Sequence, residues 1–157
     1  MSGFKIIDGA MGSELIRRGE TLPEHIWSAA VNTTNPSMVQ QIHREYIVGG
    51  ADYITTNTFR TTPRAYAKTE VKGKGLDYSK EQALASLNIA VNIAKEAVID
   101  SSTKIIGSIA PLEDCYMPQL FPGKDKAITE FTQLSRWFTE AGVDILLFET
   151  MNSIAET

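Results

Sequence analysis

Two acidic residues and one amide follow short apolar or β-branched runs in this 157-residue sequence. Asp8 and Glu149 each come directly after such a run, and Asn57 stands at the end of another. A carboxylate that closes a buried strand needs a partner or a ligand, because an unpaired charge is costly away from water. Two acids and an amide that meet at one binding site would suit a ligand with an ammonium group.

The four residues after Asp8 add a second kind of binding group. Gly9 and Gly12 belong to a loop that leads into a predicted helix, and the free backbone N–H groups of a helix start favour a carboxylate. An amino acid carries both an ammonium and a carboxylate. The simpler alternatives are a turn or cap role for Asp8, which precedes a glycine, and a structural role for Asn57.

The predicted elements alternate between strands and helices. Strands are expected over residues 4–7, 52–58, 104–109 and 144–148, and helices over about 12–18, 36–48, 79–98 and 125–141. Asn35 followed by Pro36 is typical of a helix start, and Ser79 with Gln82 resembles a capping box. Residues 20–34 are expected to be an irregular crossing that carries Trp27. Along the last helix, Ile128, Phe131, Leu134 and Phe138 are predicted to be buried.

This order predicts an α/β protein with about four parallel strands and helical crossovers. Residues 50–58 (GADYITTNT) and 142–150 (GVDILLFET) also repeat one pattern, a helix end followed by a strand and a polar residue. Repeated βα units build a (βα)8 barrel of the TIM type, whose active site collects at the carboxyl ends of its strands. An open doubly wound sheet is the alternative, although no G-x-G-x-x-G follows the first strand.

Composition narrows the class of partner. The net charge is −4 and the sequence pI about 5.2, so we expect no nucleic acid or anionic membrane as a partner. The single cysteine, Cys115, excludes an internal disulfide and fits a reducing compartment. No run is long enough for a signal peptide core or a membrane span, so we predict a cytoplasmic protein.

Five segments together resemble the homocysteine S-methyltransferase family. They are residues 8–15 (DGAMGSEL), Trp27-Ser28 with Asn35-Pro36, residues 50–59 (GADYITTNTF), residues 107–111 (GSIAP) and residues 142–151 (GVDILLFETM). Their order and spacing match over essentially the whole chain. The resemblance implies a TIM barrel that transfers a methyl group to the sulfur of homocysteine and forms methionine.

The resemblance also assigns roles to residues. Asp8 and Glu149 fall where the family binds the amino group of homocysteine, and the backbone around Gly9 and Ala110 falls near its carboxylate. No catalytic residue is assigned in this chain. The residues present do not distinguish betaine, S-methylmethionine, S-adenosylmethionine or a folate as the methyl donor.

The family activates the thiol with zinc, which holds the sulfur deprotonated. Its ligands are three cysteines, which the family carries after its sixth and eighth strands. This chain has only Cys115, in the loop after the third predicted strand, where the family has no ligand. Zinc is therefore implied by the family, but its ligands are absent from this chain.

Residues 1–157 are thus expected to be one partial domain, the N-terminal half of a homocysteine-binding barrel. Such a half leaves strand edges free, which invites self-association or pairing with a complementing C-terminal half. Two hypotheses follow. Either the chain is the homocysteine-binding half of a methyltransferase that is inactive alone, or it is a catalytically silent half barrel that dimerises or binds a partner chain.

Overall fold

The computed structural model describes residues 3–69 and 75–156. Its centre is a parallel sheet of three strands in the order β1-β2-β3, which are Tyr53–Thr55, Lys104–Ile109 and Ile145–Phe148. These strands confirm three of the four predicted ones. The first predicted strand, residues 4–7, runs beside β1 but makes only one isolated parallel bridge, between Ile7 and Tyr53.

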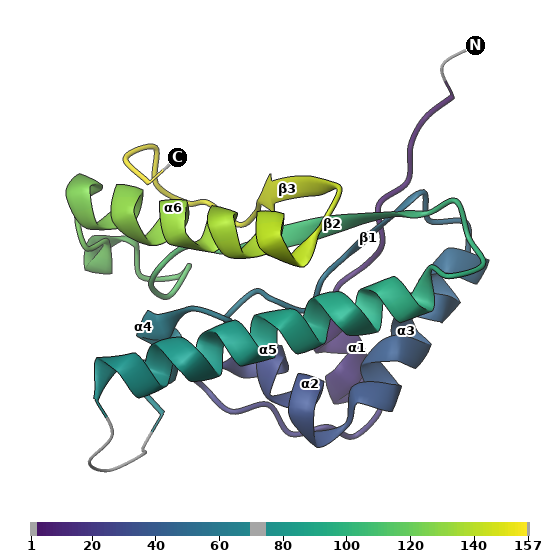
Figure 1. Ribbon diagram of the computed structural model, residues 1–157, viewed down its shortest axis with the longest axis horizontal. Coiled ribbons are helices and arrows are strands. Elements are labelled where there is room, and N and C mark those ends of the chain that lie inside the picture. The colour runs from purple at the N-terminus through teal and green to yellow at the C-terminus, as the bar shows by residue number, and fades with distance from the viewer. Residues whose placement is uncertain (1–2, 70–74, 157) are drawn as a thin grey trace.

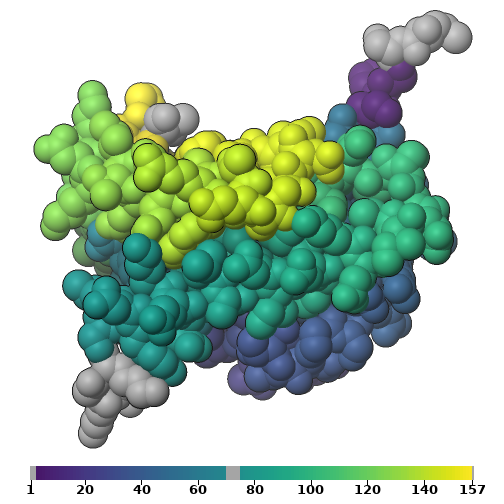
Figure 2. Space-filling view, in the orientation of Figure 1, coloured from purple at the N-terminus to yellow at the C-terminus, as the bar shows by residue number. Residues whose placement is uncertain are grey.

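Helices connect every strand to the next. The longer ones are α3 (Pro36–Val48), α5 (Leu76–Ala97) and α6 (Lys124–Ala141). Shorter ones are α1 (Met11–Arg17), α2 (Val31–Thr34), α4 (Pro63–Ala67) and the 3-10 turns Trp27–Ala30 and Pro118–Leu120. Figure 1 shows α5 running between α3 and α6, and Figure 2 shows α6 and the C-terminal segment packed along α5. The parallel sheet and its helical crossovers are those expected.

One face of β2 contacts two successive helices, and this separates the two fold alternatives. Ile105 packs in a cluster with Ala94 of α5, while Ile109 packs in a cluster with Phe138 of α6. Gly107 lies between them, where a Cβ would stand 2.7 Å from the Phe138 ring. Residues 105, 107 and 109 share one face of a strand, so α5 and α6 cover the same side of the sheet. A barrel has this arrangement, whereas a doubly wound sheet has helices on both faces.

Three local predictions were wrong. The helix predicted to open at Ser79 begins at Leu76, because Gly75 takes the extended cap position and Asp77 supplies an acid in the first turn. The crossing predicted to be irregular contains the 3-10 turn Trp27–Ala30 and α2. Ile128 of α6 is 55% exposed, because no described element covers that part of the helix. The Asn35 cap is confirmed, since its side chain accepts a hydrogen bond from the Met38 N–H at 3.3 Å.

His43 of α3 is fully buried, and neither of its ring nitrogens has a hydrogen-bond partner among the described residues. Burial lowers the pKa of this imidazole to about 4. The side chain is therefore neutral at physiological pH, and it is buried on the same helix as the core residues Val39 and Ile42.

Candidate functional site

A cavity of about 400 Å³ lies at the carboxyl ends of the strands. Its walls come from the turn after Ile7 and the start of α1, the 3-10 turn at Trp27 and the carboxyl ends of β1, β2 and β3. The lining includes Asp8, Gly9, Gly12, Trp27, Thr55, Asn57, Ser108, Glu149 and Thr150. Of the predicted site residues, the structure brings Asp8, Gly9, Asn57 and Glu149 together here. Ala110 is 2% exposed and is not part of the lining.

Asp8 is held by one residue of the neighbouring strand. Its carboxylate accepts hydrogen bonds from the Thr55 N–H at 2.9 Å and the Thr55 hydroxyl at 3.0 Å. Burial nevertheless raises the pKa of Asp8 to about 6, because these two bonds only partly offset the loss of water and the nearby charge of Glu149 adds to the increase. A carboxyl group perturbed in this way within a cavity is typical of functional sites.

Glu149 is held from the other side. Its Oε1 accepts a hydrogen bond from the Ser108 hydroxyl, and its N–H donates to the Ile109 carbonyl at 3.0 Å. Thr150, the next residue, has a φ of 58°, which is rare for a β-branched residue. Trp27, with a φ of 46°, is the other non-glycine residue with positive φ in the described part of the chain. Both line the cavity, and backbone strain of this kind concentrates at functional sites.

The lining has acids but no bases. Among the described residues around the cavity there is no Lys, Arg or His to neutralise Asp8 and Glu149. The partners of both carboxylates are neutral N–H and O–H groups, which fix their positions without cancelling their charge. The arrangement can therefore accept a cation, and its hydrogen-bonding geometry suits an ammonium group.

Asn57 lines the cavity, but its amide already has protein partners. Its Nδ2 donates to the Ser28 carbonyl and to Asn32 Oδ1, both at 2.8 Å. The backbone carbonyl of Asn57 accepts a hydrogen bond from Asn32 Nδ2 at 2.9 Å. These buried bonds tie the turn that carries Trp27 to the end of β1. Gly9 is also close-packed, because a Cβ there would stand 2.7 Å from the Tyr46 hydroxyl.

Sequence reasoning missed Thr55 and Ser108, the residues that hold the two acids. Ser108 had one signal, since it is a lone polar residue within the apolar run of β2. Thr55 had none, because threonine is common in strands for reasons of packing. Trp27 was predicted only to lie in an irregular crossing, and its place in the lining of the cavity was missed.

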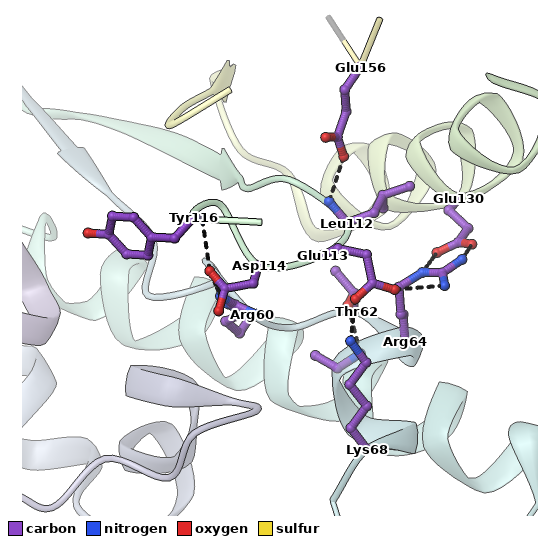
Figure 3. A network of polar contacts seen from close by, with 11 residues as sticks. Arg60, Thr62, Arg64, Lys68, Leu112, Glu113, Asp114, Tyr116, Glu130 and Glu156 are labelled. Atoms are coloured by element: carbon purple, nitrogen blue, oxygen red, sulfur yellow. Dashed lines mark hydrogen bonds and ion pairs between the residues drawn. The ribbon is translucent and has the colours of Figure 1, made fainter. Parts of the chain in front are cut away.

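A second group of acidic side chains surrounds Arg64 of α4, as Figure 3 shows. Arg64 Nη1 lies 3.0 Å from Glu113 and its Nε lies 3.1 Å from Glu130, while Lys68 also pairs with Glu113. These contacts join the loop after β2 to α4 and α6. Nearby, the buried Glu156 accepts a hydrogen bond from the Leu112 N–H at 2.7 Å.

In residues 3–69 and 75–156 no group of three or more His, Cys, Asp or Glu side chains could hold a metal ion. None of the helices described is long and apolar enough to cross a membrane.

The larger hollow in the molecule lies away from the acid pair. It measures about 660 Å³ and runs along α6, where Ile128, Phe131 and Phe148 contribute apolar walls. It lacks Asp8, Glu149 and their partners, so the smaller cavity is the candidate ligand site.

A parallel βα sheet covered by helices on one side, with acids at its carboxyl ends, belongs to the barrel class of α/β folds. Comparison with protein families gives a match to the homocysteine S-methyltransferase model over residues 5–157, and the chain belongs to this family.

Individual relatives agree. The chain is 28% identical to homocysteine S-methyltransferase of Escherichia coli, over 96% of this chain and 51% of that protein. It is 36% identical to selenocysteine Se-methyltransferase of Brassica oleracea over 60% of this chain and 25% of the relative. The metallated crystal structure of the homocysteine methyltransferase MmuM from Escherichia coli matches with a TM-score of 0.81 and 25% identity, over 99% of this chain and 57% of that one. The chain thus spans about half the length of the Escherichia coli proteins that it matches along nearly all of its own length.

Proposed function

We propose that this chain binds homocysteine and forms the substrate-binding part of a homocysteine S-methyltransferase. The observation that carries the proposal is the pair of carboxylates, Asp8 and Glu149, in a cavity whose described lining has no cation. The substrate's ammonium would lie between them. Its carboxylate would lie against the backbone of the turn at Gly9. The predicted role of the Ala110 backbone stays a prediction.

In the proposed reaction a methyl group moves from a donor to the sulfur of homocysteine, and the thiol proton is lost. The nucleophile is the thiolate, which is a small fraction of a free thiol of pKa about 8.5 at neutral pH. The family implies zinc for this activation, but Cys115 is the only cysteine and the described residues offer no three-ligand group. The residues present do not fit a zinc site, so we propose that the chain alone recognises homocysteine without methylating it.

The acid pair contacts only the amino-acid end of a substrate. A different thiol or selenol amino acid would present the same end, and one relative is named a selenocysteine Se-methyltransferase. Homocysteine is proposed first because the family model and most of the similar relatives carry its name. The lone Cys115 also agrees with the cytoplasmic location that the sequence predicts.

Calorimetric titration of the chain tests the proposal. Homocysteine should bind, whereas 4-mercaptobutanoate, which keeps the thiol and carboxylate but has no ammonium, should bind at least about tenfold more weakly because the two acids stay unpaired. Equal affinities for the two ligands, or no binding of homocysteine, would refute it.

A second candidate function is association with another copy of the chain. Ile145 and Phe148 of β3 are 42% and 44% exposed, and Ile128 of α6 is 55% exposed beside the 660 Å³ hollow. The outer edge of β3 has no strand partner in the described part of the chain, and such edges favour pairing. Sedimentation equilibrium tests this proposal: a dimer that Phe148→Lys disrupts supports it, and a monomer at all concentrations contradicts it.

A further inference from the structure

Ser108 belongs to a closed ring of hydrogen bonds at the carboxyl end of β2. Its N–H donates to Thr56 Oγ1 at 3.2 Å, and its carbonyl accepts from Thr58 Oγ1 at 2.8 Å. The two threonine hydroxyls lie 2.7 Å apart. Because the Thr58 proton points at the Ser108 carbonyl, the Thr56 hydroxyl donates to Thr58 and closes the ring. All three residues are at most 3% exposed, so water does not compete for these bonds.

The side chain of Ser108 extends from this ring to Glu149. Its hydroxyl donates to Glu149 Oε1, because an ionised carboxylate can only accept. The other carboxylate oxygen, Oε2, has no hydrogen-bond partner in residues 3–69 and 75–156. Both residues line the 400 Å³ cavity. One oxygen of Glu149 is thus fixed by the protein, and the second is left for a ligand.

We infer that Ser108 is a positioning residue, which holds the Glu149 carboxylate in the orientation that receives an ammonium group, and that Thr56 and Thr58 hold Ser108. The identity of the ligand as homocysteine rests on the proposed function. A hydroxyl that only stabilised β2 would affect folding, but it would not discriminate between ligands with and without an ammonium.

Four variants of the chain separate these roles. Ser108→Ala removes the bond to Glu149, and Thr58→Val breaks the ring while keeping the shape of the side chain. Thr58→Ser keeps the hydroxyl and serves as the matched control. Thr103→Val is the control for a buried hydroxyl elsewhere, because the Thr103 hydroxyl donates to the Ala51 carbonyl at 2.9 Å just before the amino end of β2.

Calorimetry with homocysteine and 4-mercaptobutanoate gives the first readout. Ser108→Ala should weaken homocysteine binding about tenfold, the usual size of a lost hydrogen bond to a charged group, and change binding of the analogue less than about twofold. Thr58→Val should also weaken homocysteine binding more than binding of the analogue, but by a smaller factor than Ser108→Ala. Both controls should bind like the unsubstituted chain. An equal loss for both ligands would overturn the inference.

A second readout needs no ligand. Three-bond NMR couplings report the χ1 angle of Glu149, which should occupy one rotamer in the unsubstituted chain and several in Ser108→Ala and Thr58→Val. If homocysteine does not bind the unsubstituted chain but these couplings become averaged, the proposed function fails while the role of Ser108 stands. A single rotamer retained in Ser108→Ala would overturn the positioning role.

Discussion

Two groups of acidic side chains in this molecule have opposite surroundings. Around Arg64, the acids Glu113 and Glu130 are paired with cations of the protein itself (Figure 3). In the cavity, Asp8 and Glu149 are held by hydroxyl and N–H groups, and no cation lies in the described lining. Cations of the protein neutralise the acids of the first group, which hold a loop in place. The acids of the second group can be neutralised only by a cation from a bound ligand.

This difference explains why the two groups should respond differently to substitution. A buried acid without a cationic partner costs stability, and it persists where a ligand supplies the missing charge. A paired acid contributes to stability and gains nothing from a ligand. Neutralising an acid of the cavity should therefore weaken ligand binding strongly and raise the stability of the fold. Removing a charge around Arg64 should lower the stability and leave ligand binding unchanged.

The largest expected effect is the loss of binding when the cavity acids are neutralised. Asp8→Asn and Glu149→Gln should each weaken homocysteine binding by about 100-fold or more, because an ammonium left with one charged partner in a partly buried site loses several kcal/mol. Calorimetric titration measures this loss. Glu113→Gln is the matched control, and a comparable loss of binding in that variant would mean that the two groups do not differ as described.

The pH dependence of folding should show the cost of Asp8. Its pKa in the folded protein is about 6, above the ordinary value of 3.8, so the folded state binds the proton more tightly than the unfolded state does. The contribution of Asp8 to stability therefore rises as the pH falls from about 6 towards 4. At pH 7, Asp8→Asn should be about 2 kcal/mol more stable than the unsubstituted chain, and this difference should vanish near pH 4.

Urea unfolding of both proteins at several pH values checks this prediction. His43 acts in the opposite direction, since its lowered pKa means that the unfolded state takes up the proton first as the pH falls below about 6.5. Both proteins contain His43, so the difference between them isolates Asp8. A variant less stable than the unsubstituted chain at pH 7 would show that the bonds from Thr55 outweigh the burial of the charge.

Removing the cation of the paired group should destabilise the fold. Arg64→Leu leaves Glu113 and Glu130 without their shared partner while both side chains are mostly buried, at 13% and 25% exposed. We expect a loss of about 1–2 kcal/mol in the free energy of unfolding, with unchanged affinity for homocysteine. Thermal unfolding and calorimetry on the same sample measure both quantities. Weaker binding without a loss of stability would contradict the purely structural role of Arg64.

The smallest expected effect concerns the strained residue beside Glu149. Thr150 has a φ of 58°, which glycine adopts freely. Thr150→Gly should therefore keep the stability or raise it by up to about 1 kcal/mol, and it should loosen the hold on Glu149 and weaken binding a few-fold. Chemical unfolding and calorimetry provide the test. A loss of stability would show that the threonine makes contacts that outweigh its strain.

The sequence predicted the large-scale features because they depend on periodic patterns. The strands at β1, β2 and β3, the helix start at Asn35 and the position of Glu149 directly after β3 all follow from apolar runs and their boundaries. The fold class and the family are confirmed. Those features are local or repeat along the chain, and tertiary structure did not override them.

The missing parts of the prediction depend on contacts between distant segments. Thr55 lies 47 residues from Asp8, and Ser108 lies 41 residues from Glu149. The local sequence marks Ser108 only as a lone polar residue in an apolar run, and it does not mark Thr55 at all. The exposure of Ile128 had a similar cause, because an apolar stripe predicts burial but does not say which neighbour provides it.

Titration of Asp8 shows whether the cavity pairs two acids for an external cation. The Asp8 carboxyl carbon can be titrated by NMR in the chain with and without saturating homocysteine. The midpoint should lie at about 6 without ligand and lower with it, because an ammonium beside the carboxylate favours the ionised form. A midpoint that homocysteine leaves unchanged or raises would contradict the account.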